Sequence, residues 1–137
     1  AGYHADMTRS FATKGYSDEQ KSIYDIVLNA QVKSIEGIKS GMSCKSIDSI
    51  ARDHIANAGY SKFFDHGLGH SLGLEIHEDP RFSKVSEDVL EENYVMTVEP
   101  GIYVPDIGGV RIEDDIIVTK NGAEILNKTS KEFQVIS

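Results

Sequence analysis

The patterning of the chain changes at Gly59, and this change constrains the fold more than any other feature. Before Gly59, two segments carry apolar residues at helical spacing. After Gly59 no long helical pattern recurs, and the runs at residues 94–103 and 110–118 are rich in Val, Ile and Tyr, as strands are. Helices followed by many strands are typical of an α+β fold, in which an antiparallel sheet has helices on one face.

Local signals place the ends of the two helices. Ser17 and Gln20 form a capping box, which predicts where the first helix starts, and we expect that helix to stop at Gly41. We predict that the second helix starts after the cap Ser43 and ends at Gly59. A strand is predicted over residues 3–12, and Asn121-Gly122 predicts a tight hairpin turn near the C-terminal end.

Composition excludes several classes of partner. A chain of 137 residues is normally one domain with a real core. Its net charge of −8 argues against nucleic acid, which requires clustered Lys and Arg. No apolar run approaches the roughly 18 residues of a membrane span. The single cysteine, Cys44, cannot form an internal disulfide, which favours a reducing cytoplasm, and we interpret it as a buried, idle thiol.

A glycine-rich stretch over residues 66–80 contains three histidines, His66, His70 and His77. Glycines allow the backbone to approach closely to a ligand that the imidazoles bind. For an isolated histidine a structural role is the better interpretation, and we accept it for His4 and His54. The cluster becomes a candidate site only through the carboxylates elsewhere in the chain.

Three carboxylates lie in otherwise apolar, strand-like runs: Asp6, Glu99 and Glu113. A buried carboxylate requires compensation, because an unpaired buried charge costs several kcal/mol. Taken alone, Glu113 would be expected to form a salt bridge with Arg111 on an exposed sheet face. Together with His70, the three carboxylates instead indicate a divalent metal site.

These residues resemble the catalytic domain of the pita-bread metallopeptidases, the group of methionine aminopeptidase, aminopeptidase P and prolidase. The resemblance covers Gly2 to about Val118. The strings Glu-Pro-Gly-Ile-Tyr at 99–103 and Gly-Val-Arg-Ile-Glu-Asp-Asp at 109–115 are most similar to the Xaa-Pro branch. The resemblance implies a curved antiparallel sheet that holds metals on its concave side, with helices on the outer face.

The resemblance also implies the roles of individual residues. Asp6 and Glu113 would bridge two ions, most simply Mn²⁺, with Co²⁺, Fe²⁺ or Zn²⁺ as options, while His70 and Glu99 complete the shell of one ion. The catalytic residues implied are His77, which would support the oxyanion, Glu99, which would move protons, His66 in the substrate pocket, and Arg111, which would position a ligand. The substrate would be a dipeptide or short peptide with proline second.

One departure concerns the first of the family's five ligands, an aspartate about eleven residues before the position of Asp6. That position falls before Ala1, so we expect residues 1–137 to be a C-terminal catalytic portion, truncated at its N-terminus and without the non-catalytic N-terminal domain. We therefore expect one tightly held ion and reduced activity in this chain. The full-length protein is expected to be a homodimer.

Other functions stay open at this point. A non-catalytic pita-bread module that binds peptides or proteins would have lost its ligands, whereas this chain keeps the four that it can contain, and the same observation disfavours metal-free, creatinase-like hydrolysis. A methionine aminopeptidase is disfavoured by Pro-Gly-Ile-Tyr at 100–103 and by Asp114-Asp115. Nothing in the residues separates a dipeptidase from an aminopeptidase.

Overall fold

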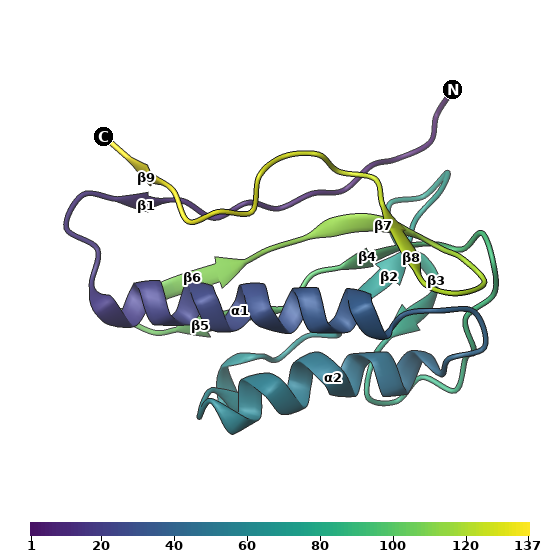
Figure 1. Cartoon of the computed structure of the whole chain (residues 1–137), viewed down its shortest axis with the longest axis horizontal. Coiled ribbons are helices and arrows are strands. Elements are labelled where there is room, and N and C mark those ends of the chain that lie inside the picture. The colour runs from purple at the N-terminus through teal and green to yellow at the C-terminus, as the bar shows by residue number, and fades with distance from the viewer.

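The computed structural model describes every residue, 1–137, and sets two helices against one face of an antiparallel sheet (Figure 1). Helix α1 spans Asp18–Gly37 and helix α2 spans Cys44–Asn57. The predicted capping box starts α1: Gln20 N donates to Ser17 Oγ at 3.2 Å, and Ser17 N donates to Gln20 Oε1 at 2.8 Å.

Helix α1 ends at Gly37, four residues before the predicted stop at Gly41. The difference has a tertiary cause, because the amides that would continue the helix bind elsewhere. Ser40 N donates to Thr119 O at 3.0 Å and Gly41 N donates to Leu90 O at 2.8 Å. Gly41 instead lies in the following turn with φ +88°, a conformation that favours glycine.

Five antiparallel strands form the main sheet in the order β3-β2-β4-β7-β8. Their bounds are Gly69–Ser71 for β2, Glu78–Phe82 for β3, Val95–Val98 for β4, Asp114–Val118 for β7 and Ala123–Ile125 for β8. A separate hairpin pairs β5, Gly101–Val104, with β6, Gly108–Arg111, and a short 3-10 turn covers Ser61–Phe63. The predicted turn at Asn121-Gly122 joins β7 to β8, where Thr119 N donates to Gly122 O at 2.9 Å.

The N-terminal segment differs from the strand predicted over residues 3–12. Regular pairing is confined to β1, Ala12–Thr13, which runs parallel to β9, Val135–Ile136. Before β1 the segment forms a single bridge, between Thr8 and Glu113. Side chains take the place of a continuous ladder here: Asp6 N, for example, donates to the carboxylate of Asp115 at 2.9 Å.

The hydrophobic core lies between the helices and the sheet. Met96 and Val98 of β4, together with Ile116 of β7, are fully buried against apolar residues of α1 and α2. Cys44 is buried at the start of α2, and burial raises the pKa of its thiol to about 11, as expected for an inert cysteine. Neither helix combines the length and apolar character needed to cross a lipid bilayer.

Candidate functional site

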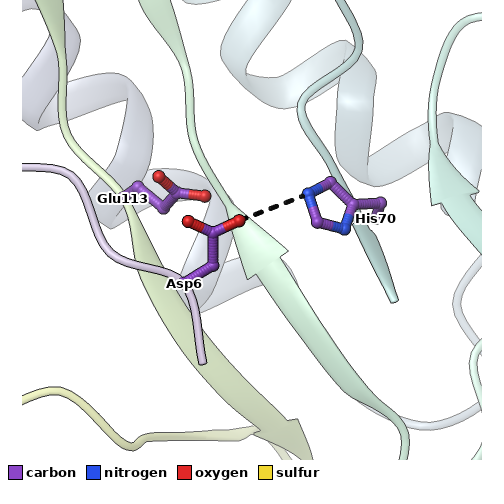
Figure 2. Close-up of side chains that lie close together, drawn as sticks. All are labelled: Asp6, His70 and Glu113. Atoms are coloured by element: carbon purple, nitrogen blue, oxygen red, sulfur yellow. Dashed lines mark ion pairs between the residues drawn. The ribbon is translucent and has the colours of Figure 1, made fainter. Parts of the chain in front are cut away.

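Asp6, His70 and Glu113 converge from three separate elements, as Figure 2 shows. Asp6 lies in the extended N-terminal segment, His70 in β2, and Glu113 directly before β7. One donor atom from each of the three side chains lies within 4.8 Å of the other two. The structure therefore brings together residues that stand far apart in the sequence.

Hydrogen bonds orient the imidazole of His70. Its Nδ1 donates to the carbonyl of Ser71 at 3.0 Å, which leaves Nε2 facing the carboxylates. His70 Nε2 lies 3.1 Å from Glu99 Oε1 and 3.9 Å from Asp6 Oδ2. A histidine whose second nitrogen is fixed by a backbone carbonyl is the usual arrangement of a metal ligand.

Glu99 follows the end of β4 and is held by its own strand. Thr97 Oγ1 donates to Glu99 Oε1 at 2.9 Å and accepts from His70 N at 3.0 Å, so one hydroxyl connects both residues. Gly69 allows the close approach of β2 to Thr97, because a Cβ there would lie 2.0 Å from Thr97 O. The glycine before His70 is thus required by packing.

Glu113 is 2 % exposed and is held by the N-terminal segment. Its N–H donates to Thr8 O at 3.1 Å, and the hydroxyl of Thr8 donates to its carboxylate. Arg111 Nε reaches the same hydroxyl at 3.2 Å and forms no ion pair with Glu113. The exposed Arg111–Glu113 salt bridge considered from the sequence is therefore wrong, and Arg111 acts on Glu113 through Thr8.

Burial and mutual repulsion shift the pKa values of the site. Burial raises the pKa of Glu113 to about 7, Glu99 and Asp6 push it in the same direction, and the Thr8 hydrogen bond opposes them. For Glu99, burial is outweighed by the hydrogen bonds from His70 and Thr97, which lower its pKa. For His70, burial is likewise outweighed by Glu99 and the Ser71 carbonyl, which raise its pKa.

The residues present fit a divalent cation. Asp6 and Glu113 each place a carboxylate oxygen within 4.8 Å of a His70 nitrogen, and Glu99 adds a third carboxylate, 3.1 Å from His70 Nε2. Such mixed donors suit manganese, iron, cobalt or zinc better than calcium or magnesium. The raised pKa of Glu113 indicates that the site lacks positive charge to balance its carboxylates. A bound cation would supply that charge and favour the ionised form of Glu113.

A pocket of about 480 Å³ opens in front of these residues. The His77 ring lies 4.5 Å from the His70 ring between centroids, and His66 Nε2 lies 2.9 Å from the hydroxyl of Tyr103. The polar side chains that line the pocket include His66, His70, His77, Arg81, Glu99 and Arg111. All four residues assigned catalytic roles from the sequence therefore face this space.

Sequence reasoning missed Thr8, Tyr103 and Arg81. Thr8 stands two residues after Asp6, and this spacing along an extended segment was an available signal. Tyr103 stood in the motif at 99–103 but was given no role, and Arg81 gave no signal of its own, since only the folded β3 brings it to the pocket. His54 lies on α2 beside Lys33, at 3.1 Å, and His4 contacts Gly73, so neither enters the group of ligands.

Residues 1–120 match the model of metallopeptidase family M24. The chain belongs to metallopeptidase family M24. A divalent metal ion is therefore the cofactor implied for the family's site.

Two proteins illustrate the similarity in sequence. The Xaa-Pro dipeptidase of Pyrococcus horikoshii is 53% identical over 131 residues, which is 96% of this chain and 37% of that protein. The uncharacterized peptidase YqhT of Bacillus subtilis is 47% identical over 98% of this chain and 38% of its own length. The chain thus spans little more than a third of the relatives it matches.

Solved structures agree with these matches. The Xaa-Pro dipeptidase from Bacillus anthracis superposes with a TM-score of 0.97 at 50% identity, over 98% of this chain and 38% of that one. The X-Pro aminopeptidase from Thermotoga maritima gives a TM-score of 0.94 at 43% identity, again over 98% of this chain and 38% of that one. The expected pita-bread α+β fold of the Xaa-Pro branch is confirmed.

Proposed function

We propose that this chain carries the metal ligands and catalytic residues of a peptidase that cleaves the bond before proline in dipeptides or short peptides. The observation that carries the proposal is the convergence of His70 with three carboxylates beside a pocket lined by two further histidines. The similarity to an Xaa-Pro dipeptidase and an X-Pro aminopeptidase supports the preference for proline.

Each side chain has a role that follows from its place. Asp6, His70, Glu99 and Glu113 would hold a divalent ion, most simply Mn²⁺, which lowers the pKa of water and polarises a carbonyl when bound. Glu99 would accept the proton of the attacking water and deliver it to the leaving nitrogen. His77, beside His70 in the pocket, would donate a hydrogen bond to the developing oxyanion.

Substrate orientation would fall to the wall of the pocket. His66 is fixed there, because its Nδ1 donates to Gly67 O at 2.7 Å and its Nε2 faces Tyr103. Arg81 also lines the pocket, and its only ion pair is with the exposed Asp79 at 3.3 Å. A guanidinium that is paired only with an exposed carboxylate, through Nε, can still bind the terminal carboxylate of a dipeptide, which favours a dipeptidase over an aminopeptidase.

The variant R81A tests this preference. We expect KM for Ala-Pro to rise roughly 10-fold, with little change in kcat. This factor is the lower end of the range for a hydrogen bond to a charged group, because Arg81 is exposed to solvent. KM for a peptide with a C-terminal amide should not change. The control K84A removes an exposed cation three residues away and outside the pocket. Equal losses for both substrates would contradict the role of Arg81.

The proposed function itself is tested by metal content and turnover together. After removal of metal and reloading, we expect one Mn²⁺ per chain, because the four residues supply donors for a single complete shell. Proline should be released from Ala-Pro slowly, Ala-Ala should be cleaved more slowly still, and E99Q should abolish both reactions. Two ions per chain together with rapid turnover would refute the expectation of a site that binds a single ion. Absence of metal binding would refute the peptidase and favour a non-catalytic module that binds peptides.

A further inference from the structure

The C-terminal tail, residues 129–136, lies alongside the N-terminal segment that carries Asp6 (Figure 1). The two run parallel where β9 pairs with β1, and Ala12 N donates to Gln134 O at 3.0 Å. The tail also binds α1: the hydroxyl of Tyr24 donates to Lys131 O at 3.0 Å, and the Phe133 ring packs edge-on against Tyr24, with centroids 5.1 Å apart.

The tail places one cation, Lys131, against Asp114, the first residue of β7 and the residue directly after Glu113. Lys131 Nζ lies 2.8 Å from Asp114 Oδ2, and Asp114 is fully buried. Arg9 donates to the other oxygen of Asp114 at 2.6 Å, and Gln31 donates to Oδ2 at 2.9 Å. Burial alone would raise the pKa of Asp114, but these donors outweigh it, led by Lys131, and lower the pKa. The buried carboxylate is thus compensated from the tail and the N-terminal segment together.

Arg9 connects this cluster to the candidate ligands. Its guanidinium, on a side chain that is 5% exposed, donates to Glu113 O at 2.6 Å and to Thr129 O at 2.9 Å. Thr8 then holds Glu113 through its own carbonyl and hydroxyl. The tail therefore holds Arg9, residues 8–9 hold Glu113, and Asp6 lies two residues before Thr8.

We propose that the C-terminal tail is a clasp that keeps Asp6 and Glu113 at the separation needed to bind an ion, with Lys131 as its positioning residue. This inference rests on the metal site of the proposed function. The tail also packs on α1, but its one buried ion pair is made with Asp114, the residue directly after Glu113. Lys131 does not line the pocket, so it would not contact substrate. It acts on the ligands through Asp114, which also binds Arg9.

The variant K131M tests the clasp in the whole 137-residue chain, with K128M as control. Lys128 is exposed, lies in the same region and forms no ion pair. Loss of a positive charge would by itself strengthen cation binding, so weaker binding reports lost positioning. In calorimetric titrations with Mn²⁺ we expect K131M to bind roughly 10-fold more weakly, as for other residues that orient ligands, and K128M to bind like wild type. K131R, which keeps the charge, should recover most of the loss.

Wild-type affinity in a folded K131M would overturn the clasp and leave the metal site standing. Failure of the wild type to bind Mn²⁺ would overturn both. Should K131M not fold, hydrogen exchange on the wild type decides, because coupling between two sites is reciprocal. Mn²⁺ binding should then slow exchange of the Ala12 amide, which donates to the tail. An unchanged rate would refute the proposal.

Discussion

Replacing His70 with alanine is expected to abolish the stabilisation of the chain by Mn²⁺. His70 offers the only imidazole among the four candidate ligands, and its loss should weaken Mn²⁺ binding by more than the roughly 10–100-fold typical of residues that merely orient ligands. At a free Mn²⁺ concentration of 100 times Kd, the wild type should gain about 2.7 kcal/mol in free energy of unfolding. Under the same conditions H70A should gain close to nothing.

The variant H54A is the matched control for this experiment. His54 lies on α2 beside Lys33, away from the group of ligands, so its loss should leave the response to Mn²⁺ unchanged. Chemical unfolding with and without Mn²⁺ gives both free energies. A Mn²⁺-dependent gain of wild-type size in H70A would remove this histidine from the proposed ligand set.

The stability of the metal-free chain is expected to fall as the pH rises from 5 to 8. Glu113 has a folded-state pKa of about 7 against an ordinary value of 4.5, so the folded chain binds more protons than the unfolded chain between these values. This difference amounts to about 3 kcal/mol of unfolding free energy, lost across that window. The raised pKa of His70 acts in the same direction, because its protonated form is favoured in the folded state.

Two other shifts act only at lower pH. Glu99 and Asp114 have lowered pKa values, so the stability that they contribute is lost as the pH falls through their folded-state values. Unfolding free energies measured at pH 5, 6, 7 and 8 for the wild type and E113Q test the prediction. E113Q should be much less sensitive to pH in this window. Equal slopes for the two proteins would show that Glu113 does not titrate there.

Bound metal should weaken this dependence of stability on pH. An ion competes with protons for Glu113 and His70, so the affinity for Mn²⁺ should rise with pH over the same window. The metal-loaded chain would then lose less stability than the metal-free chain as the pH increases. Calorimetric titrations at pH 6 and 8 compare the two affinities directly.

The sequence revealed the candidate ligands but not what holds them. His70, Glu99 and Glu113 stand in glycine-rich or apolar runs, where their residue types are unusual, but their selection as ligands also required their combination with one another and the resemblance to the metallopeptidase family. The helix start at Ser17 was predictable from neighbouring residues, because its capping box is local. Helix α2 also begins directly after Ser43, as predicted, although the Ser43 side chain makes no capping hydrogen bond.

The supporting contacts depend on pairings that no local pattern reports. Lys131 carries no unusual signal in the sequence, and its partner Asp114 lies 17 residues earlier on another element. The early end of α1 and the replacement of a regular strand by side-chain contacts before β1 have the same origin. In each case the backbone or side chain binds a distant segment, and that choice is decided by the assembled sheet.

The bridge between Thr8 and Glu113 joins residues 105 positions apart, nearly the two ends of the chain. Contacts of such long range form slowly, because loop-closure entropy must be overcome before they contribute any free energy. During translation, a nascent chain that still lacks residue 113 can hold the N-terminal segment at His4, whose N–H donates to Gly73 O, but lacks the partner that fixes Thr8. The ion site consequently cannot nucleate folding, and metal loading is expected to follow the synthesis and docking of the strand that begins after Glu113.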